Sequence, residues 1–279
     1  TVTHEAEKRG RGVMVFGTFN LYGGNITGNQ TDGNYNDRGT FGAGVYVATY
    51  SVFNMHGGKI TGNMGYSGGG SVYVAPTYAD SSRAVFNMSG GEISGNSSLY
   101  GNSSGVYVNG GEFIMSGGSI TGNATNDETY GSGGGVCLYG TFYLSGDSII
   151  QNNTKAGSTD NLYLGWQTIN ITGPLGENAH IGVTAENVPR SFISGWSNNM
   201  VGENPADYFS SDGDACGIGL NANGDVVLGS LCTTITLNPN GGALPEYSLV
   251  AGAALPIPTK TGYTFAGWYE NQEFSGDPV

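Results

Sequence analysis

An eleven-residue phrase occurs five times between residues 19 and 152 and limits the possible folds more than any other feature. Each copy begins with Phe and ends with Asn, and most carry Gly-Gly in the middle. The copies are Phe19–Asn29, Phe53–Asn63, Phe86–Asn96, Phe113–Asn123 and Phe142–Asn152. The repeating units that contain them are 26 to 34 residues long. A repeat of this length is typical of a solenoid, in which each unit packs only on its neighbours.

A second apolar phrase precedes each copy. It reads Val13–Val15, Val45–Val47, Val72–Val74, Val106–Val108 and Val136–Leu138, and Leu162–Leu164 opens a sixth unit. Each unit therefore holds three short stretches in which apolar and polar residues alternate, the pattern of a strand with one inward face. Stacked units bury that face through parallel ladders about 4.8 Å apart. The pattern predicts a parallel β-helix.

The inward columns of this β-helix follow from the alignment of the units. One column is Val45, Val72, Val106, Val136 and Leu162; a second is Phe19, Phe53, Phe86, Phe113 and Phe142; a third is Ile26, Ile60, Ile93, Ile120 and Ile149. The final Asn of each copy, Asn29, Asn63, Asn96, Asn123 and Asn152, is expected to form a hydrogen-bonded ladder at one corner. Gly, at 51 of 279 residues, and Asn suit corners because both tolerate positive φ.

The repeat fades after Leu164, and the chain divides into three predicted parts. Residues 1–183 form the β-helix, 184–230 a β-rich capping segment, and 231–279 a separate module. Within the capping segment, strands are expected at 217–220 and 225–228, joined by a turn at Ala222-Asn-Gly224. Covering the open end of a β-helix protects its exposed strand edges.

Charge and composition exclude several classes of partner. The formal net charge is −13, which disfavours nucleic acid and anionic membrane surfaces. No apolar run is long enough to span a bilayer. Cys137 falls in an outward position and is expected to be an exposed thiol. Whether Cys216 and Cys232 pair is left open by their spacing.

The last part of the chain carries the phrases Thr234-Ile-Thr-Leu-Asn-Pro-Asn-Gly-Gly242 and Gly262-Tyr-Thr-Phe-Ala-Gly-Trp-Tyr269. These residues resemble the Listeria–Bacteroides (internalin B-type) repeat of bacterial surface proteins. The resemblance implies a small β-grasp-like module, serving as spacer or interaction domain. The final strand usual in that family does not follow, so the module is expected to be truncated and to continue into further domains of the same polypeptide.

The Gly-Val-Tyr-Val and Met-Ser-Gly-Gly phrases of residues 12–230 resemble the right-handed β-helix repeats of secreted proteins from gut bacteria, with the pectin-lyase-like shape. The expected fold is thus all-β: a right-handed parallel β-helix of about six to seven coils with a C-terminal cap, then the β-grasp-like module. Lyases, glycoside hydrolases and adhesins share this shape, so the fold alone does not name an activity.

A search for catalytic groups argues against an enzyme. Glycoside hydrolysis needs two carboxylates about 5–9.5 Å apart, whereas the outward strand positions are mostly Tyr, Asn, Thr and Ser. Lys59 and Glu92 share one repeat position and are expected to form a surface ion pair. The three His residues are scattered. We therefore predict no catalytic site, no metal and no cofactor.

Tyrosine gives the strongest binding signal. The corner loops carry Tyr35, Tyr66, Tyr100 and Tyr130 with Asp37 and Asp127, and Tyr78 lies in the loop at 75–84; together these are the candidate ligand contacts. A second set, Tyr46, Tyr73, Tyr107 and Tyr163, forms a predicted surface stripe. Tyrosine offers an apolar face and a polar tip to a sugar or a protein. The alternative is that these rings only stabilise neighbouring strands.

Three functions remain open. The first is a non-catalytic adhesin or binding module, secreted or attached to a bacterial surface, that presents its loop edge to a glycan or host protein. The second is a rigid stalk whose binding domain lies elsewhere in the polypeptide. The third is a polysaccharide-cleaving enzyme with an unusual site in the long loops.

Overall fold

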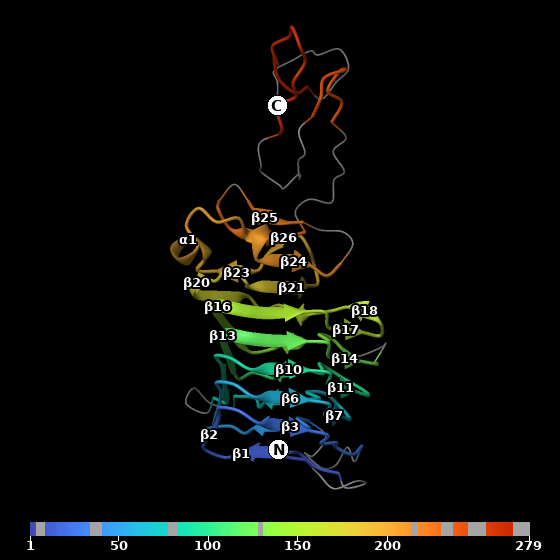
Figure 1. The fold of residues 1–279 in the computed structure, drawn as a ribbon, viewed down its shortest axis with the longest axis vertical. Coiled ribbons are helices and arrows are strands. Elements are labelled where there is room, and N and C mark those ends of the chain that lie inside the picture. Colours follow the sequence, from blue (N-terminus) through green and yellow to red (C-terminus); the bar gives the residue numbers. More distant parts are fainter. Residues whose placement is uncertain are drawn as a thin grey trace.

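The computed structural model describes residues 1–3, 9–33, 41–77, 83–127, 131–213, 217–221, 223–229, 237–244 and 255–269. The chain forms a parallel β-solenoid of about six turns (Figure 1), which confirms the predicted fold class. Helix is confined to one turn, α1 (Trp196–Asn199), and a 3-10 turn (Pro205–Asp207) within the described part. None of the helices found there is long and apolar enough to cross a membrane.

Each complete coil contributes three strands, and like strands stack in parallel. The first stack is β1 (Val13–Val15), β4 (Val45–Val47), β8 (Val72–Val74), β12 (Val106–Val108), β15 (Val136–Leu138) and β19 (Leu162–Tyr163). The second is β2 (Thr18–Leu21), β5 (Val52–Met55), β9 (Val85–Met88) and the first halves of β13 (Glu112–Thr121) and β16 (Thr141–Gln151). The third is β3 (Asn25–Thr27), β6 (Lys59–Thr61), β10 (Glu92–Ser94) and the second halves of β13 and β16.

The register places like side chains on one another, because the Phe-to-Ile spacing is constant through the first four copies. Phe19, Phe53, Phe86, Phe113 and Phe142 form one continuous stack, with ring centroids 5.4, 4.9, 5.0 and 4.9 Å apart from the first pair to the last. All but Phe19 are fully buried. Stacked aromatic pairs contribute about 0.5–1.5 kcal/mol each beyond their area burial.

The fifth copy departs from the predicted columns by one residue. Between Met115 and Gly117 the pairing with β16 shifts, so Ile150 rather than Ile149 pairs with Ile120. The predicted membership of Ile149 is therefore wrong, and Asn153 rather than Asn152 joins the corner ladder. The cause is one extra residue, a β-bulge near Gly146, whose φ of 60° suits glycine.

A short fourth strand follows the Asn corner in the central coils and builds a side sheet. Its strands are β7 (Met64–Gly65), β11 (Ser97–Ser98), β14 (Ala124–Thr125), β17 (Thr154–Lys155) and β18 (Ser158–Thr159). The first four pair in parallel, but β17 and β18 form an antiparallel hairpin. The hairpin ends the side sheet, so no described strand continues it into the coils above.

The C-terminal end of the solenoid is closed by the segment after β20 (Ile169–Leu175) and β21 (His180–Thr184). β23 (Ile193–Ser194) and β24 (Phe209–Ser211) still pair in parallel with them, beyond residue 183 where the cap was expected to begin. The predicted hairpin is confirmed as β25 (Ile218–Leu220) and β26 (Val226–Leu228), joined by β22 (Arg190–Ser191) in an antiparallel sheet.

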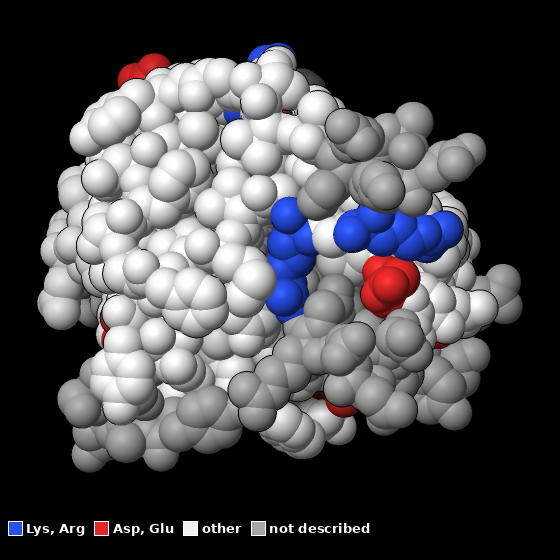
Figure 2. All heavy atoms as spheres, turned by 90° about the horizontal axis from the view of Figure 1, so that it is seen from below, with Lys and Arg blue, Asp and Glu red and all other residues white. Residues whose placement is uncertain are grey.

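The two ends of the chain differ. Figure 2 looks onto the N-terminal end of the solenoid, whose described surface is mostly uncharged.

In the last module, the described residues contain one isolated antiparallel bridge, Ala243 to Thr259. The β-grasp-like arrangement therefore stays a prediction. Cys216 and Cys232 lie outside the described residues.

Candidate functional site

The Asn corner forms a continuous ladder of buried amides. The main-chain N–H and the Nδ2 group of each Asn both donate to Oδ1 of the Asn in the next coil, at 2.8–3.1 Å. The order is Asn29, Asn63, Asn96, Asn123, Asn153 and Asn161. Asn161 in turn donates to both oxygens of Asp212, at 2.6 Å each. A carboxylate therefore terminates the ladder.

A polar notch lies beside this end of the ladder, where the side sheet stops. It is a cleft of about 480 Å³. Its lining consists only of amide, hydroxyl, imidazole and carboxylate residues: Gln151, Asn152, Asn153, Thr154, Thr159, Asn161, His180, Ser210, Ser211 and Asp212. Gln151 ends β16, His180 and Ser210 lie on β21 and β24, and Thr159 ends the hairpin. The notch lies where the described part of the next coil adds no fourth strand to the side sheet.

Two groups in the notch resemble a nucleophile and its base. Ser210 Oγ lies 3.3 Å from His180 Nε2. The nearby carboxylate does not complete a catalytic triad, since the oxygens of Asp212 accept hydrogen bonds from Asn161 and from the Thr184 hydroxyl at 3.0 Å. A triad needs that carboxylate on the second histidine nitrogen. The geometry favours hydrogen bonding to a ligand over acyl transfer.

Acidic residues hold the main chain of the loops along the same edge. The predicted ligand contact Asp127 is buried, and its Oδ2 accepts a hydrogen bond from the Gly101 N–H at 2.7 Å. Asp160 repeats this role one coil later, accepting from the Gly133 N–H at 2.9 Å. Burial raises the pKa of Asp160 above its ordinary value. Each carboxylate therefore holds a loop of the preceding coil.

Two of the predicted loop tyrosines lie together. Tyr66 follows β7 and Tyr100 follows β11, with ring centroids 5.2 Å apart and planes tilted by 55°. Tyr100 is 57% exposed and Tyr66 is half-buried. The other predicted contacts of this set, Tyr35, Asp37, Tyr78 and Tyr130, lie outside the described residues. The described pair therefore marks the loop edge that ends at the polar notch.

The predicted tyrosine stripe is not an exposed surface. Tyr73, Tyr107 and Tyr163 are buried, and only Tyr46 is half-buried. Phe41 stacks on Tyr73 at 4.9 Å, and the guanidinium of Arg11 lies 4.3 Å from the Tyr46 ring centre. The expectation of a surface stripe is wrong because neighbouring loops cover these outward positions.

Two hydroxyls of this covered aromatic layer, those of Tyr107 and Tyr163, are held in their protonated form. Burial raises the pKa of Tyr107 to about 12. Burial also raises the pKa of Tyr163, whose hydroxyl donates to Glu186 at 2.8 Å. This layer stabilises the first strand stack, which is the alternative the sequence left open for these residues.

Cys137 is fully buried, so the expectation of an exposed thiol is wrong. It pairs with Tyr107 below and Tyr163 above, inside the covered aromatic layer. Burial strongly raises the pKa of its thiol. A protonated, inaccessible thiol is a poor nucleophile and metal ligand.

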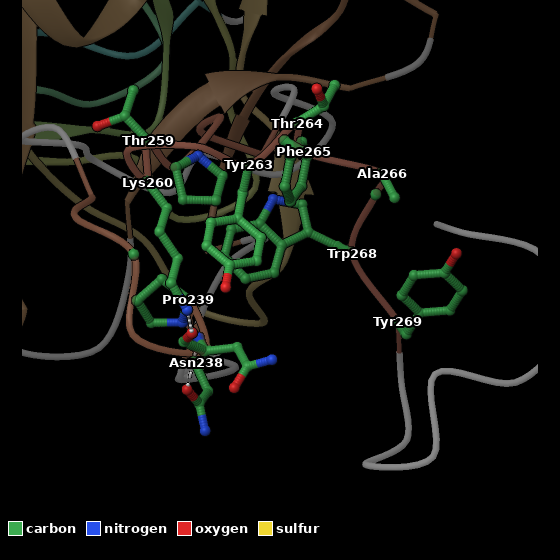
Figure 3. A pocket seen from close by; sticks show the side chains of 14 residues that line it. Asn238, Pro239, Thr259, Lys260, Tyr263, Thr264, Phe265, Ala266, Trp268 and Tyr269 are labelled. Atoms are coloured by element: carbon green, nitrogen blue, oxygen red, sulfur yellow. Dashed lines mark hydrogen bonds between the residues drawn. The ribbon is translucent and has the colours of Figure 1, made fainter.

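A second cleft, of about 360 Å³, lies in the C-terminal module (Figure 3). Lys260 Nζ donates to the Asn240 carbonyl at 3.0 Å and lies 4.7 Å from the Tyr263 ring centre. Trp268 donates from Nε1 to the Pro256 carbonyl at 2.9 Å, and its ring contacts Phe265. The polar tip of the tryptophan is thus already satisfied within the module.

Sequence reasoning missed the notch because its walls come from segments outside the repeat. Gln151, Thr154 and the Asn residues occupy repeat positions, whereas Thr159, His180, Ser210 and Asp212 follow no period. The signal in the sequence was the end of the fifth copy, where Gln151-Asn152 replaces the Gly-Asn pair that ends the other four copies. The described residues contain no cluster of His, Cys, Asp and Glu that could hold a metal ion.

Comparison with known proteins gave no match to a family model, to a curated protein or to a solved structure. The two family resemblances read from the sequence phrases therefore stay predictions. Function has to be argued from the geometry of the site.

Proposed function

We propose that the chain is a non-catalytic binding module of a bacterial surface or secreted protein, and that it binds a neutral glycan along the loop edge. The observation that carries this proposal is the polar notch, a 480 Å³ cleft lined by amide, hydroxyl, imidazole and carboxylate groups without a single apolar residue. Sugar hydroxyls both donate and accept hydrogen bonds, and such groups complement them.

The charge of the chain selects among glycans. A net charge of −13 repels polyanions such as uronic acid polymers at low ionic strength. Asp212 adds a local negative charge beside the notch. A neutral polysaccharide is therefore the favoured ligand class.

The rest of the edge supports a long ligand over a single sugar. Tyr66 and Tyr100 lie on successive coils of the side sheet that ends at the notch. An exposed ring provides a flat surface for a sugar face. Weak contacts repeated along one polymer add through effective concentration.

The test is a neutral-glycan array followed by affinity measurement on the intact chain. A Gln151→Ala/His180→Ala variant is expected to weaken binding about tenfold, since each lost hydrogen bond contributes about 0.5–1.5 kcal/mol. Thr121→Ala is the matched control: Thr121 occupies the Gln151 position one coil below, outside the notch. Circular dichroism confirms that the variants remain folded.

A second pair of variants tests the tyrosine edge. Tyr100→Ala is expected to weaken binding of a polymer more than of a short oligosaccharide. Tyr50→Ala removes an equally exposed ring from a different turn, between β4 and β5, and is expected to have no effect.

The outcomes separate the three functions. Binding that survives the notch variants contradicts the proposed site. No binding across the array favours the stalk. Release of reducing sugar from a polymer favours an enzyme.

A further inference from the structure

The first coil of the solenoid has strand partners on one side only. Among the described residues, β1 pairs with β4 alone and β2 pairs with β5 alone. Every complete coil above is paired on both faces. Open parallel edges leave N–H and C=O groups without ladder partners, which is the usual template for adding another strand.

The third strand stack, in contrast, already extends one step lower. Val2 pairs in parallel with Ile26, its N–H donates to the Asn25 carbonyl, and its carbonyl accepts from the Thr27 N–H. Asn29 Nδ2 also donates to the Val2 carbonyl, as Asn63 Nδ2 does to that of Ile26. Thr1–Thr3 thus occupies the third-strand position of a preceding coil whose first two strands have no counterpart among the described residues.

Large apolar side chains are exposed at this end of the solenoid. Met14 is 47% exposed and Phe16 77% exposed. Phe19 is only half-buried, although the four phenylalanines above it are fully buried. Figure 2 shows Lys or Arg and Asp or Glu side chains near the middle of this face, with mostly uncharged residues around them. An exposed strand edge is an interaction surface or an aggregation site unless it is covered.

We propose that this face pairs in parallel with one further coil of the same repeat, with a Val-x-Val strand under β1 and a Phe-x-Met strand under β2. The proposal follows from the unpaired edges of β1 and β2 and from the register of Val2. A phenylalanine seven residues before Val2 would extend the aromatic stack, because that spacing separates Phe19 from Ile26 and Phe53 from Ile60.

Strand direction argues against a second copy docked end to end on this face. Two such faces related by a twofold axis would place their strands antiparallel. The described strands of the first two stacks pair in parallel, and a coil of the same direction keeps that pairing.

A graft tests the proposal on the full chain. Residues Val45–Gly58, which hold the first two strands of the second coil, are copied in front of Thr1. This placement puts the copied Phe53 seven residues before Val2. Hydrogen exchange followed by mass spectrometry can monitor β1 and β2 separately, because the graft duplicates peptides of the second coil only.

The graft is expected to slow amide exchange in β1 and β2 at least tenfold and to raise the unfolding midpoint by roughly 5 °C. A control graft of equal length carries Val45→Asp and Phe53→Asp in the copied segment and is expected to give no protection. Unchanged exchange with the unmodified graft would overturn the proposal. So would a concentration-dependent dimer of the parent chain that the graft abolishes, because a second copy would then cover the face.

Discussion

Replacing one asparagine in the middle of the buried ladder tests what holds the coils in register. Asn96→Ala removes the Oδ1 atom that accepts from both the N–H and Nδ2 of Asn63, each at 3.0 Å. It also removes the Nδ2 donor to the Ile60 carbonyl at 2.9 Å. Asn63 Nδ2 keeps other acceptors, whereas the buried Asn63 N–H loses the side-chain oxygen to which it donates.

The expected loss follows from the Asn63 N–H, which is left without this acceptor. An unsatisfied buried donor costs about 1–3 kcal/mol, and this is the loss predicted for Asn96→Ala. The chain offers a matched control. Asn54 sits in an outward amide ladder, donating to Asn20 and accepting from Asn87 at 2.7 Å each, where water can replace both bonds. Asn54→Ala is expected to cost less than about 1 kcal/mol.

Chemical denaturation followed by circular dichroism measures both free energies of unfolding. Hydrogen exchange adds a local readout, because a solenoid can open coil by coil. The largest increase in exchange is expected at Asn63 and its neighbours in the second and third coils. Equal losses in the two variants, or unchanged exchange at Asn63, would refute the role of the buried ladder in satisfying the main chain.

Two other predictions follow from buried titratable groups. Cys137 is expected to react with a thiol reagent at pH 8 only after unfolding, because burial both shields it and raises its pKa; rapid labelling of the folded chain would contradict this. Asp160 has a folded pKa raised above the ordinary 3.8, so its contribution to stability is fully present below about pH 4 and is lost as the pH rises through the folded pKa. Asp160→Asn keeps an acceptor for the Gly133 N–H, so the free energy of unfolding of this variant, relative to that of the unchanged protein, should increase between pH 3.5 and 7. If the two free energies instead change in parallel with pH, ionisation of Asp160 does not destabilise the fold.

The columns of the core could be predicted because each side chain direction follows from period-2 alternation, and the Phe-to-Ile spacing is constant through four copies. The ion pair between Lys59 and Glu92 is confirmed at 2.7 Å for the same reason. Prediction failed in the fifth copy because Ile149-Ile150 and Asn152-Asn153 are doublets. Either member fits the pattern, and only the bulge near Gly146 decides between them.

The tyrosine stripe shows a different limit of the pattern. Alternation tells which side chains point out of the solenoid, but it does not tell whether a loop then covers them. Phe41 belongs to the longest corner loop, between Asn29 and Val45, and it packs on Tyr73. Coverage of this kind depends on non-repeating residues, and so does the notch. An alignment of the repeats therefore predicts neither the coverage of the tyrosines nor the notch.

The side-chain hydrogen bonds between members of the Asn ladder all point from one coil to the next toward the C-terminus. The two ends of the solenoid therefore differ, and each of the two proposals concerns one end. Each asparagine donates two hydrogen bonds to the asparagine of the next coil. At the C-terminal end Asp212 accepts both bonds, and its side chain has no N–H with which to donate further. At this end the side sheet stops and leaves the polar notch. At the N-terminal end, β1 and β2 have partners on one side only among the described residues. The proposed further coil would pair at that end, away from the notch.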